Sequence, residues 1–228
     1  MSQVPAETAA SRESKLLVAC EFAIVVALFV ADMRHHIFFS KVPYLLVLAW
    51  VSLRLRGMRW KDLGLARPRD WPRTLTAGIL VGIGIELLEL FVTQPLLVRV
   101  TGKMPDLSDL GNLRGNVKLL LLFLLLTWTL AAFGEEMVYR GYLMNRVAGL
   151  GKDSRTTWIV SLVLVSAIFG FGHLDQGITG QVENAIDGLL LGVLYLACGR
   201  NLWAPIIAHG ITDTVDITLL FIGKYPGL

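Results

Sequence analysis

Two adjacent glutamates and an arginine interrupt one of the most apolar parts of this sequence. The stretch FGEEMVYRGYL, residues 133–143, directly follows VKLLLLFLLLTWTLAA. A charged side chain at the centre of a bilayer costs about 2.5–3.5 kcal/mol on insertion scales, so such residues usually pair with one another or line a polar cavity. Glu136 and Arg140 are four residues apart, which predicts an ion pair on one helix face. Glu135 points about 100° away and stays free to act as a general base. The alternative is a purely structural clamp.

Two further apolar segments carry histidines. His173 ends the motif FGFGH, and His209 and Asp213 lie four residues apart in HGITD, so they share a helix face. A lone histidine on an apolar helix usually packs against its neighbours. Two histidines and two acids on three separate segments would each need a partner, so we expect them to converge on one polar cavity. At about 1.5 Å per residue, Glu135 and His173 lie within roughly 7 Å of the same depth.

The composition places these residues in a membrane. Of the 228 residues, 54% are hydrophobic and 17% charged, and the mean hydropathy is +0.61. Period-two alternation is absent, so we expect an all-α polytopic protein of about seven transmembrane helices that enclose a polar cavity. The expected spans, several of them long enough to cross hydrocarbon, are 16–33, 42–56, 74–98, 116–134 (continuing as helix to about 148), 156–173, 184–199 and 202–222.

Charge distribution sets the expected topology and the domain boundaries. Most of the 21 lysines and arginines fall in segments that are cytoplasmic if the N-terminus is inside. The net charge of +3 follows this bias, and we expect no nucleic-acid partner. Residues 1–15 are expected to form a disordered tail and residues 16–228 a single membrane domain, with membrane lipid as its surroundings.

The three motifs resemble those of a known family. EEMVYR, FGFGH and HGITD look like the EExxxR, FxxxH and HxxxN/D motifs of the CPBP (CAAX protease and bacteriocin-processing) intramembrane proteases, which include the type II CAAX prenyl endopeptidases. The resemblance covers roughly residues 110–220. It implies a multi-pass protein, expected in the plasma membrane of a prokaryote, that cleaves a membrane-associated peptide or protein substrate, prenylated or not.

The resemblance also implies roles for individual residues. Glu135 would activate a water, His173 and His209 would position it, and Arg140 would hold Glu136. Asp213 stands where the prenyl endopeptidases carry asparagine. An ionised aspartate cannot donate a hydrogen bond to an oxyanion, so its expected role is to orient His209 or to ligate a metal.

The cofactor stays open at this stage. Many relatives are described as metalloproteases, and Glu135, His173, His209 and Asp213 could hold Zn²⁺. There is no HExxH motif to fix two ligands one turn apart. A water activated by glutamate without a metal fits the same residues.

Two other functions compete with an endopeptidase. One is a non-catalytic membrane partner, or a protein of the bacteriocin-immunity type, that keeps the same residues for stability. The other is a small transporter that uses Glu135 and the histidines as a proton relay, although paired broken helices of the kind found in inverted repeats are absent.

Several other polar residues have less specific expectations. Glu86 and Glu89 either line the cavity or, as we prefer, pack against loop cations or other spans. Asp187 and Asn184 are candidates to contact the site, and Asp216 could share the task of Asp213. Glu21 and Asp32 are expected to reach water, and Lys41 to lie in an exposed loop.

Overall fold

The computed structural model describes residues 15–226, and within that range every regular element is helical. The α-helices are α1 (Lys15–Met33), α2 (Lys41–Leu55), α3 (Trp71–Leu88), α4 (Gln94–Thr101), α5 (Val117–Leu126), α6 (Met144–Leu150), α7 (Arg155–Phe171), α8 (Gly177–Ala197) and α9 (Trp203–Ile222). This confirms the predicted all-α class.

Side-chain caps define where several helices begin. Asp70 accepts a hydrogen bond from the backbone N–H of Arg73 at the start of α3. Asn116 accepts one from Leu119 at the start of α5, and Ser154 one from Thr157 at the start of α7. Each cap satisfies a backbone donor that the first helical turn leaves unpaired.

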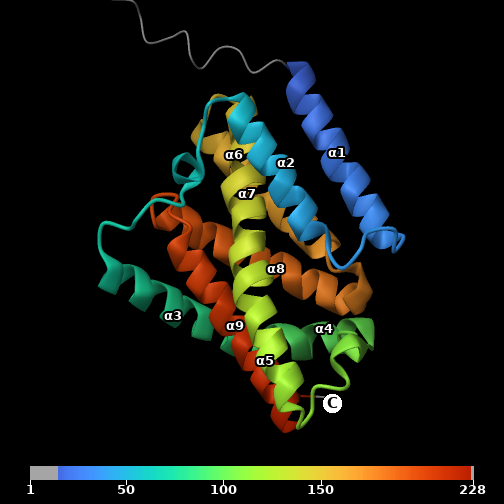
Figure 1. Ribbon diagram of the computed structural model, residues 1–228. Coiled ribbons are helices and arrows are strands. Elements are labelled where there is room, and N and C mark those ends of the chain that lie inside the picture. The colour runs from blue at the N-terminus through green and yellow to red at the C-terminus, as the bar shows by residue number, and fades with distance from the viewer. Residues whose placement is uncertain (1–14, 227–228) are drawn as a thin grey trace, which may run out of the picture.

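The predicted long helix that carries the EExxxR motif is present. It runs from Val117 to Leu150, 34 residues, and joins α5 to α6 along the length of the molecule (Figure 1). The sequence pattern predicted an ordinary helix, whereas Thr127–Glu135 and Met137–Leu143 are π-helical. π-helical turns are rare and often occur at functional sites. Here they occupy the part of the helix that carries the charged motif.

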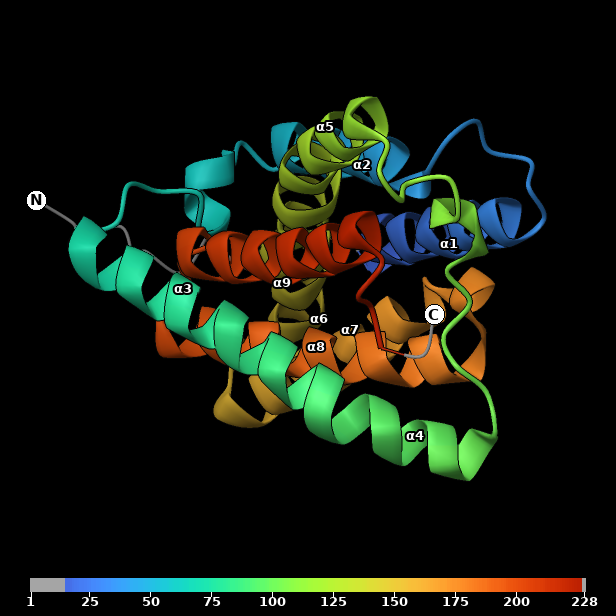
Figure 2. The same cartoon turned by 90° about the horizontal axis from the view of Figure 1, so that it is seen from below.

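Helices α3 and α9 pack closely because α3 presents glycine to α9. They lie side by side in Figure 2. A Cβ added at Gly82 would lie 2.5 Å from the carbonyl oxygen of Ala208, and the Thr212 hydroxyl donates to the carbonyl oxygen of Gly82 at 3.1 Å. This contact brings the acidic end of α3 against the part of α9 that follows His209.

A pair of alanine substitutions tests this contact. Gly82→Ala should lower the free energy of unfolding by about 1–3 kcal/mol, because the added methyl group overpacks the interface. Gly84→Ala is the matched control on the same helix, since a Cβ there meets no atom within 4 Å. Thermal unfolding of the two purified variants should show a lower melting temperature for Gly82→Ala alone. Equal melting temperatures would contradict the close contact.

The FGFGH motif forms a break between two helices. α7 ends at Phe171, and the segment Leu174–Ala197 leaves at an angle of 63° to it. His173 lies in this break, with φ −118° and ψ 40°. The bend turns the chain inward, toward the middle of the long helix.

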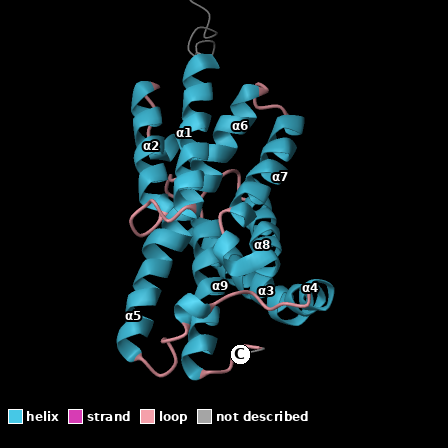
Figure 3. Cartoon of the chain, turned by 90° about the vertical axis from the view of Figure 1, so that its right-hand side faces the viewer, coloured by secondary structure: helices cyan, strands magenta, loops and turns pink. Residues whose placement is uncertain are grey.

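The other helices gather at two ends of the molecule. In Figure 3, α1, α2, α6 and α7 lie toward one end, α5 and α9 extend toward the other, and α3 and α4 lie across them. The larger apolar core lies mainly between α1, α2, the π-helical segments and α7, around Tyr139, Tyr142 and Phe169.

Length and composition support several membrane crossings. The helical stretches Trp71–Thr101, Val117–Leu150 and Trp203–Ile222 are each long and apolar enough, and the bent pair of α7 and the segment Leu174–Ala197 is a fourth if counted as one broken span. The polytopic membrane class is confirmed. The count of seven spans, the orientation and the single domain 16–228 remain predictions, and nearly all of the predicted tail lies outside the described residues.

Candidate active site

An internal cavity of about 280 Å³ lies between the long helix, α8 and α9. The four residues singled out as chemical, from three segments far apart in the sequence, all line it: Glu135, His173, His209 and Asp213. The structure therefore brings these four side chains to one cavity.

Glu136 and Arg140 form a fully buried ion pair beside the cavity. Arg140 Nη1 lies 2.6 Å from Glu136 Oε1, and the two side chains are 1% and 0% exposed. The second guanidinium nitrogen donates to the carbonyl oxygen of Gly188 in α8 at 2.8 Å. The guanidinium also lies over the Phe169 ring, 4.7 Å from its centroid. Arg140 thus ties the long helix to both α7 and α8.

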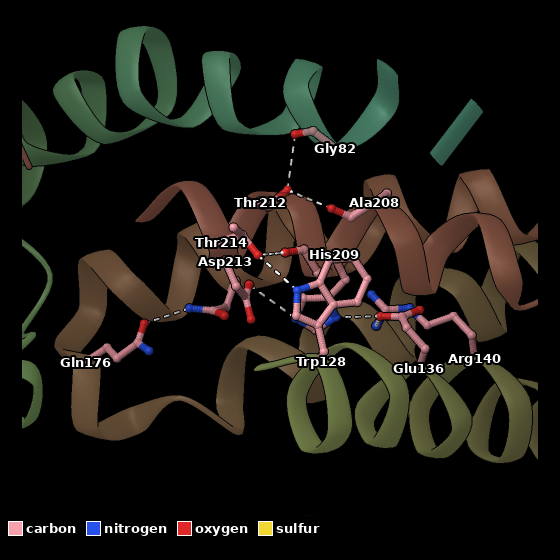
Figure 4. Close-up of polar contacts among 12 residues, drawn as sticks. Gly82, Trp128, Glu136, Arg140, Gln176, Ala208, His209, Thr212, Asp213 and Thr214 are labelled. Atoms are coloured by element: carbon pink, nitrogen blue, oxygen red, sulfur yellow. Dashed lines mark hydrogen bonds and ion pairs between the residues drawn. The ribbon is translucent and has the colours of Figure 1, made fainter. Parts of the chain in front are cut away.

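His209 lies between two carboxylates. Its Nδ1 is 2.9 Å from Glu136 Oε1, and its Nε2 is 3.5 Å from Asp213 Oδ1, as Figure 4 shows. A carboxylate only accepts, so Nδ1 carries a hydrogen that it donates to Glu136. Glu136 therefore fixes His209 as well as Arg140, which the spacing of EExxxR alone did not indicate.

Trp128, in the π-helical segment Thr127–Glu135, packs against α9. Its indole N–H donates to Thr214 Oγ1 at 3.2 Å (Figure 4). A Cβ at Gly210 would lie 2.7 Å from the Trp128 ring. Glycine in HGITD is therefore required for the close approach of the ring beside His209.

His173 is oriented by the backbone of α7, the helix that precedes it. Its Nδ1 lies 2.8 Å from the carbonyl oxygen of Phe169, and its ring packs 4.9 Å from the Phe169 ring. The carbonyl accepts, so Nδ1 carries the hydrogen and Nε2 of the neutral ring is an acceptor. His173 can thus accept a hydrogen bond from a molecule in the cavity.

Glu135 differs from Glu136 in its surroundings. Glu136 is fully buried and engaged, whereas Glu135 is partly exposed. Glu135 lines the central cavity and also a second, outer pocket of about 700 Å³. His173 lines both pockets as well. These two residues therefore lie where the two pockets meet.

The arrangement does not fit a zinc ion held by the four candidate ligands. Among the described residues, only one set of three or more His, Cys, Asp or Glu side chains has all its ligand atoms within 4.8 Å of one another. That set contains none of these four residues. His209 also directs one ring nitrogen at Glu136 and the other at Asp213. The mechanism proposed for these four residues therefore uses no metal.

The cavity is more acidic than the sequence indicated. Asp187, Asn184 and Asp216 line it as expected, and Glu89 lines it too, so the preferred packing interpretation of Glu89 was wrong. Glu183, which also lines it, was missed. Its spacing of four from Asp187 in an apolar helix was the available signal.

Two expectations for peripheral charges were also wrong. Glu21 does not reach water: it is 5% exposed, and Arg56 Nη1 lies 2.5 Å from its Oε1. Lys41 is 8% exposed and donates to Asp32 and to the carbonyl oxygen of Gly172, each at 2.8 Å. Lys41 thereby fixes the backbone directly before His173.

An all-helical membrane protein with a free carboxylate and two oriented histidines around an internal cavity defines a candidate intramembrane hydrolase. Comparison with known families agrees: residues 117–215 match the Rce1-like family, described as type II CAAX prenyl endopeptidase Rce1-like. This segment contains all three motifs, and the match confirms the resemblance on which they were identified. The segment is therefore similar to CAAX-type intramembrane proteases. No curated protein matches the chain, and no solved structure does.

Proposed function

We propose that this protein is an intramembrane endopeptidase that hydrolyses a peptide bond with a water activated by Glu135. The observation that carries the proposal is the division of labour between the adjacent glutamates. Glu136 is fully buried and binds both Arg140 and His209 through Oε1, whereas Glu135 lines the cavity that His173 also lines. A general base must be able to reach its proton and the reacting molecule, and of the two only Glu135 can.

The proposed reaction uses the groups in sequence. A water in the cavity donates one hydrogen to Glu135 and the other to Nε2 of His173. Glu135 takes the proton as the water oxygen attacks the scissile carbonyl carbon. The tetrahedral oxyanion then collapses, the C–N bond breaks, and Glu135 returns the proton to the leaving amine.

In the proposed reaction, His209 and Asp213 stabilise the negative charge that develops on the oxyanion. An imidazolium at His209 is paired with Glu136 on one side and Asp213 on the other, so it supplies positive charge near the developing oxyanion. Asp213 orients the ring. Arg140 and Glu136 are positioning residues, because they act through His209.

The proposed substrate is a membrane-associated peptide or protein, prenylated or not, and the proposed location is the plasma membrane of a prokaryote. Purified protein in proteoliposomes, incubated with matched prenylated and unprenylated peptides carrying hydrophobic tails, should yield cleaved products detectable by mass spectrometry. Saturable binding of these peptides without any cleavage would favour the alternative, a non-catalytic membrane partner.

A further inference from the structure

A second cluster of acidic groups lies between α3 and α9, and two of its residues, Glu89 and Asp216, line the same cavity as the proposed catalytic residues. Glu86 is in α3, Glu89 begins the π-helical turn Glu89–Thr93 that follows α3, and Asp216 is in α9. Their carboxylate oxygens all lie within 4.8 Å of one another. All three residues fall outside the segment 117–215 that matches the protease family. None of the three residues has a role in the proposed hydrolysis.

The carboxylates of this cluster include buried oxygens that have no hydrogen-bond partner among the described residues. Glu86 is 2% exposed, and neither of its carboxylate oxygens has such a partner there. Oδ1 of Asp216 is buried and unpartnered as well. Both acids are aimed at the same small volume. Buried carboxylates are normally hydrogen-bonded, paired with a cation or bound to a metal.

Among the described residues that line the adjacent cavity, which include Glu89 and Asp216, there is no lysine or arginine to supply a positive charge. The histidines of that wall, His173 and His209, already have partners in Phe169 and Glu136. Three carboxylates held together in a membrane interior repel one another unless a bound cation or shared protons neutralise them.

The ligand chemistry selects the kind of cation. The three residues offer only carboxylate oxygens, which are the ligands that hard divalent cations prefer. Oxygens on opposite sides of a Ca²⁺ ion, each at about 2.4 Å, are about 4.8 Å apart, and for Mg²⁺ the separation is about 4.2 Å. The limit of 4.8 Å between the oxygens here is compatible with one ion at their centre.

We propose that Glu86, Glu89 and Asp216 form a binding site for a hard divalent cation of the Ca²⁺ or Mg²⁺ class. The ion joins α3 to α9 at the wall of the central cavity. Because the Gly82 contact already brings these helices together, the ion completes an interface and does not create one. Its role is structural, and it takes no part in the proposed hydrolysis.

Equilibrium dialysis with radioactive ⁴⁵Ca²⁺, with Mg²⁺ as competitor, tests the site on purified full-length protein stripped with a chelator. Wild type should bind one ion, and Glu89→Gln and Asp216→Asn should weaken binding at least tenfold. Glu135→Gln is the control that separates this site from the catalytic one, and it should bind as wild type does. Absence of saturable binding up to about 10 mM, or equal binding by Asp216→Asn, would overturn the proposal. Loss of binding in Glu135→Gln would overturn it too, because the ion would then belong to the other residues.

Thermal unfolding separates a lost ligand from a lost fold. Saturating Ca²⁺ or Mg²⁺ should raise the melting temperature of wild type by about 5–10 °C and leave that of Asp216→Asn unchanged. Without divalent ions, Asp216→Asn should melt at or above wild type, because one repelling charge is gone. If it melts lower, the carboxylates are neutralised by shared protons and the cation proposal fails.

Discussion

Replacing Glu135 with glutamine should slow peptide cleavage by about 10²–10⁴-fold and leave the fold intact. The amide cannot accept the proton of the attacking water, and general-base catalysis contributes about this factor. Stability should change little, because Glu135 is partly exposed and lines a cavity. The measurement is the rate of product formation in proteoliposomes with a peptide that wild type cleaves.

Controls distinguish loss of the base from loss of the protein. Asp153→Asn removes an exposed carboxylate from the turn between α6 and α7. Asp153 lines neither of the two pockets, so this variant should cleave at the wild-type rate. Glu135→Asp keeps a carboxylate one methylene further from the water and should retain part of the activity. Wild-type activity in Glu135→Gln would contradict the assigned role of Glu135.

Replacing Arg140 with alanine should have the largest effect on stability, about 3–5 kcal/mol in the free energy of unfolding. The substitution leaves the Glu136 charge fully buried, with His209 as its remaining partner. It also removes the bond to Gly188 and the contact with the Phe169 ring. Thermal unfolding in detergent, together with the yield of monodisperse protein, measures the loss.

Two arginine variants sharpen that result. Arg54 is exposed and lies over the Trp50 ring, so Arg54→Ala should change stability by less than about 0.5 kcal/mol. Arg140→Lys keeps the charge but loses the fork that reaches Glu136 and Gly188 together, so it should remain clearly destabilised. A stable Arg140→Ala protein would show that Glu136 is not held in the way described.

Much of the site could be predicted because its signals are local. Charged residues within apolar runs are easily recognised as candidate functional residues. The spacing of four between Glu136 and Arg140 predicts their pairing. Antiparallel helices of known rise then place His173 near the depth of Glu135. The fold class follows from apolar runs long enough to span a bilayer.

The remainder depends on contacts between distant segments. The bond between His209 and Glu136 joins residues 73 positions apart in the chain, and no spacing rule reaches that far. The cluster of Glu86, Glu89 and Asp216 was missed because it requires α3 and α9 to touch through Gly82. Lys41 was misassigned for a similar reason, since its partner Gly172 lies 131 residues away.

The most direct test of the central claim is a single turnover in H₂¹⁸O, with enzyme in excess over substrate. If Glu135 activates a water that attacks the peptide directly, the heavy oxygen appears in the new carboxyl group of the product and not in the enzyme. Mass spectrometry of the proteolytic fragment that contains Glu135 should then show no mass increase. Heavy oxygen in Glu135 would mean that this carboxylate attacks the substrate itself, and it would contradict the mechanism.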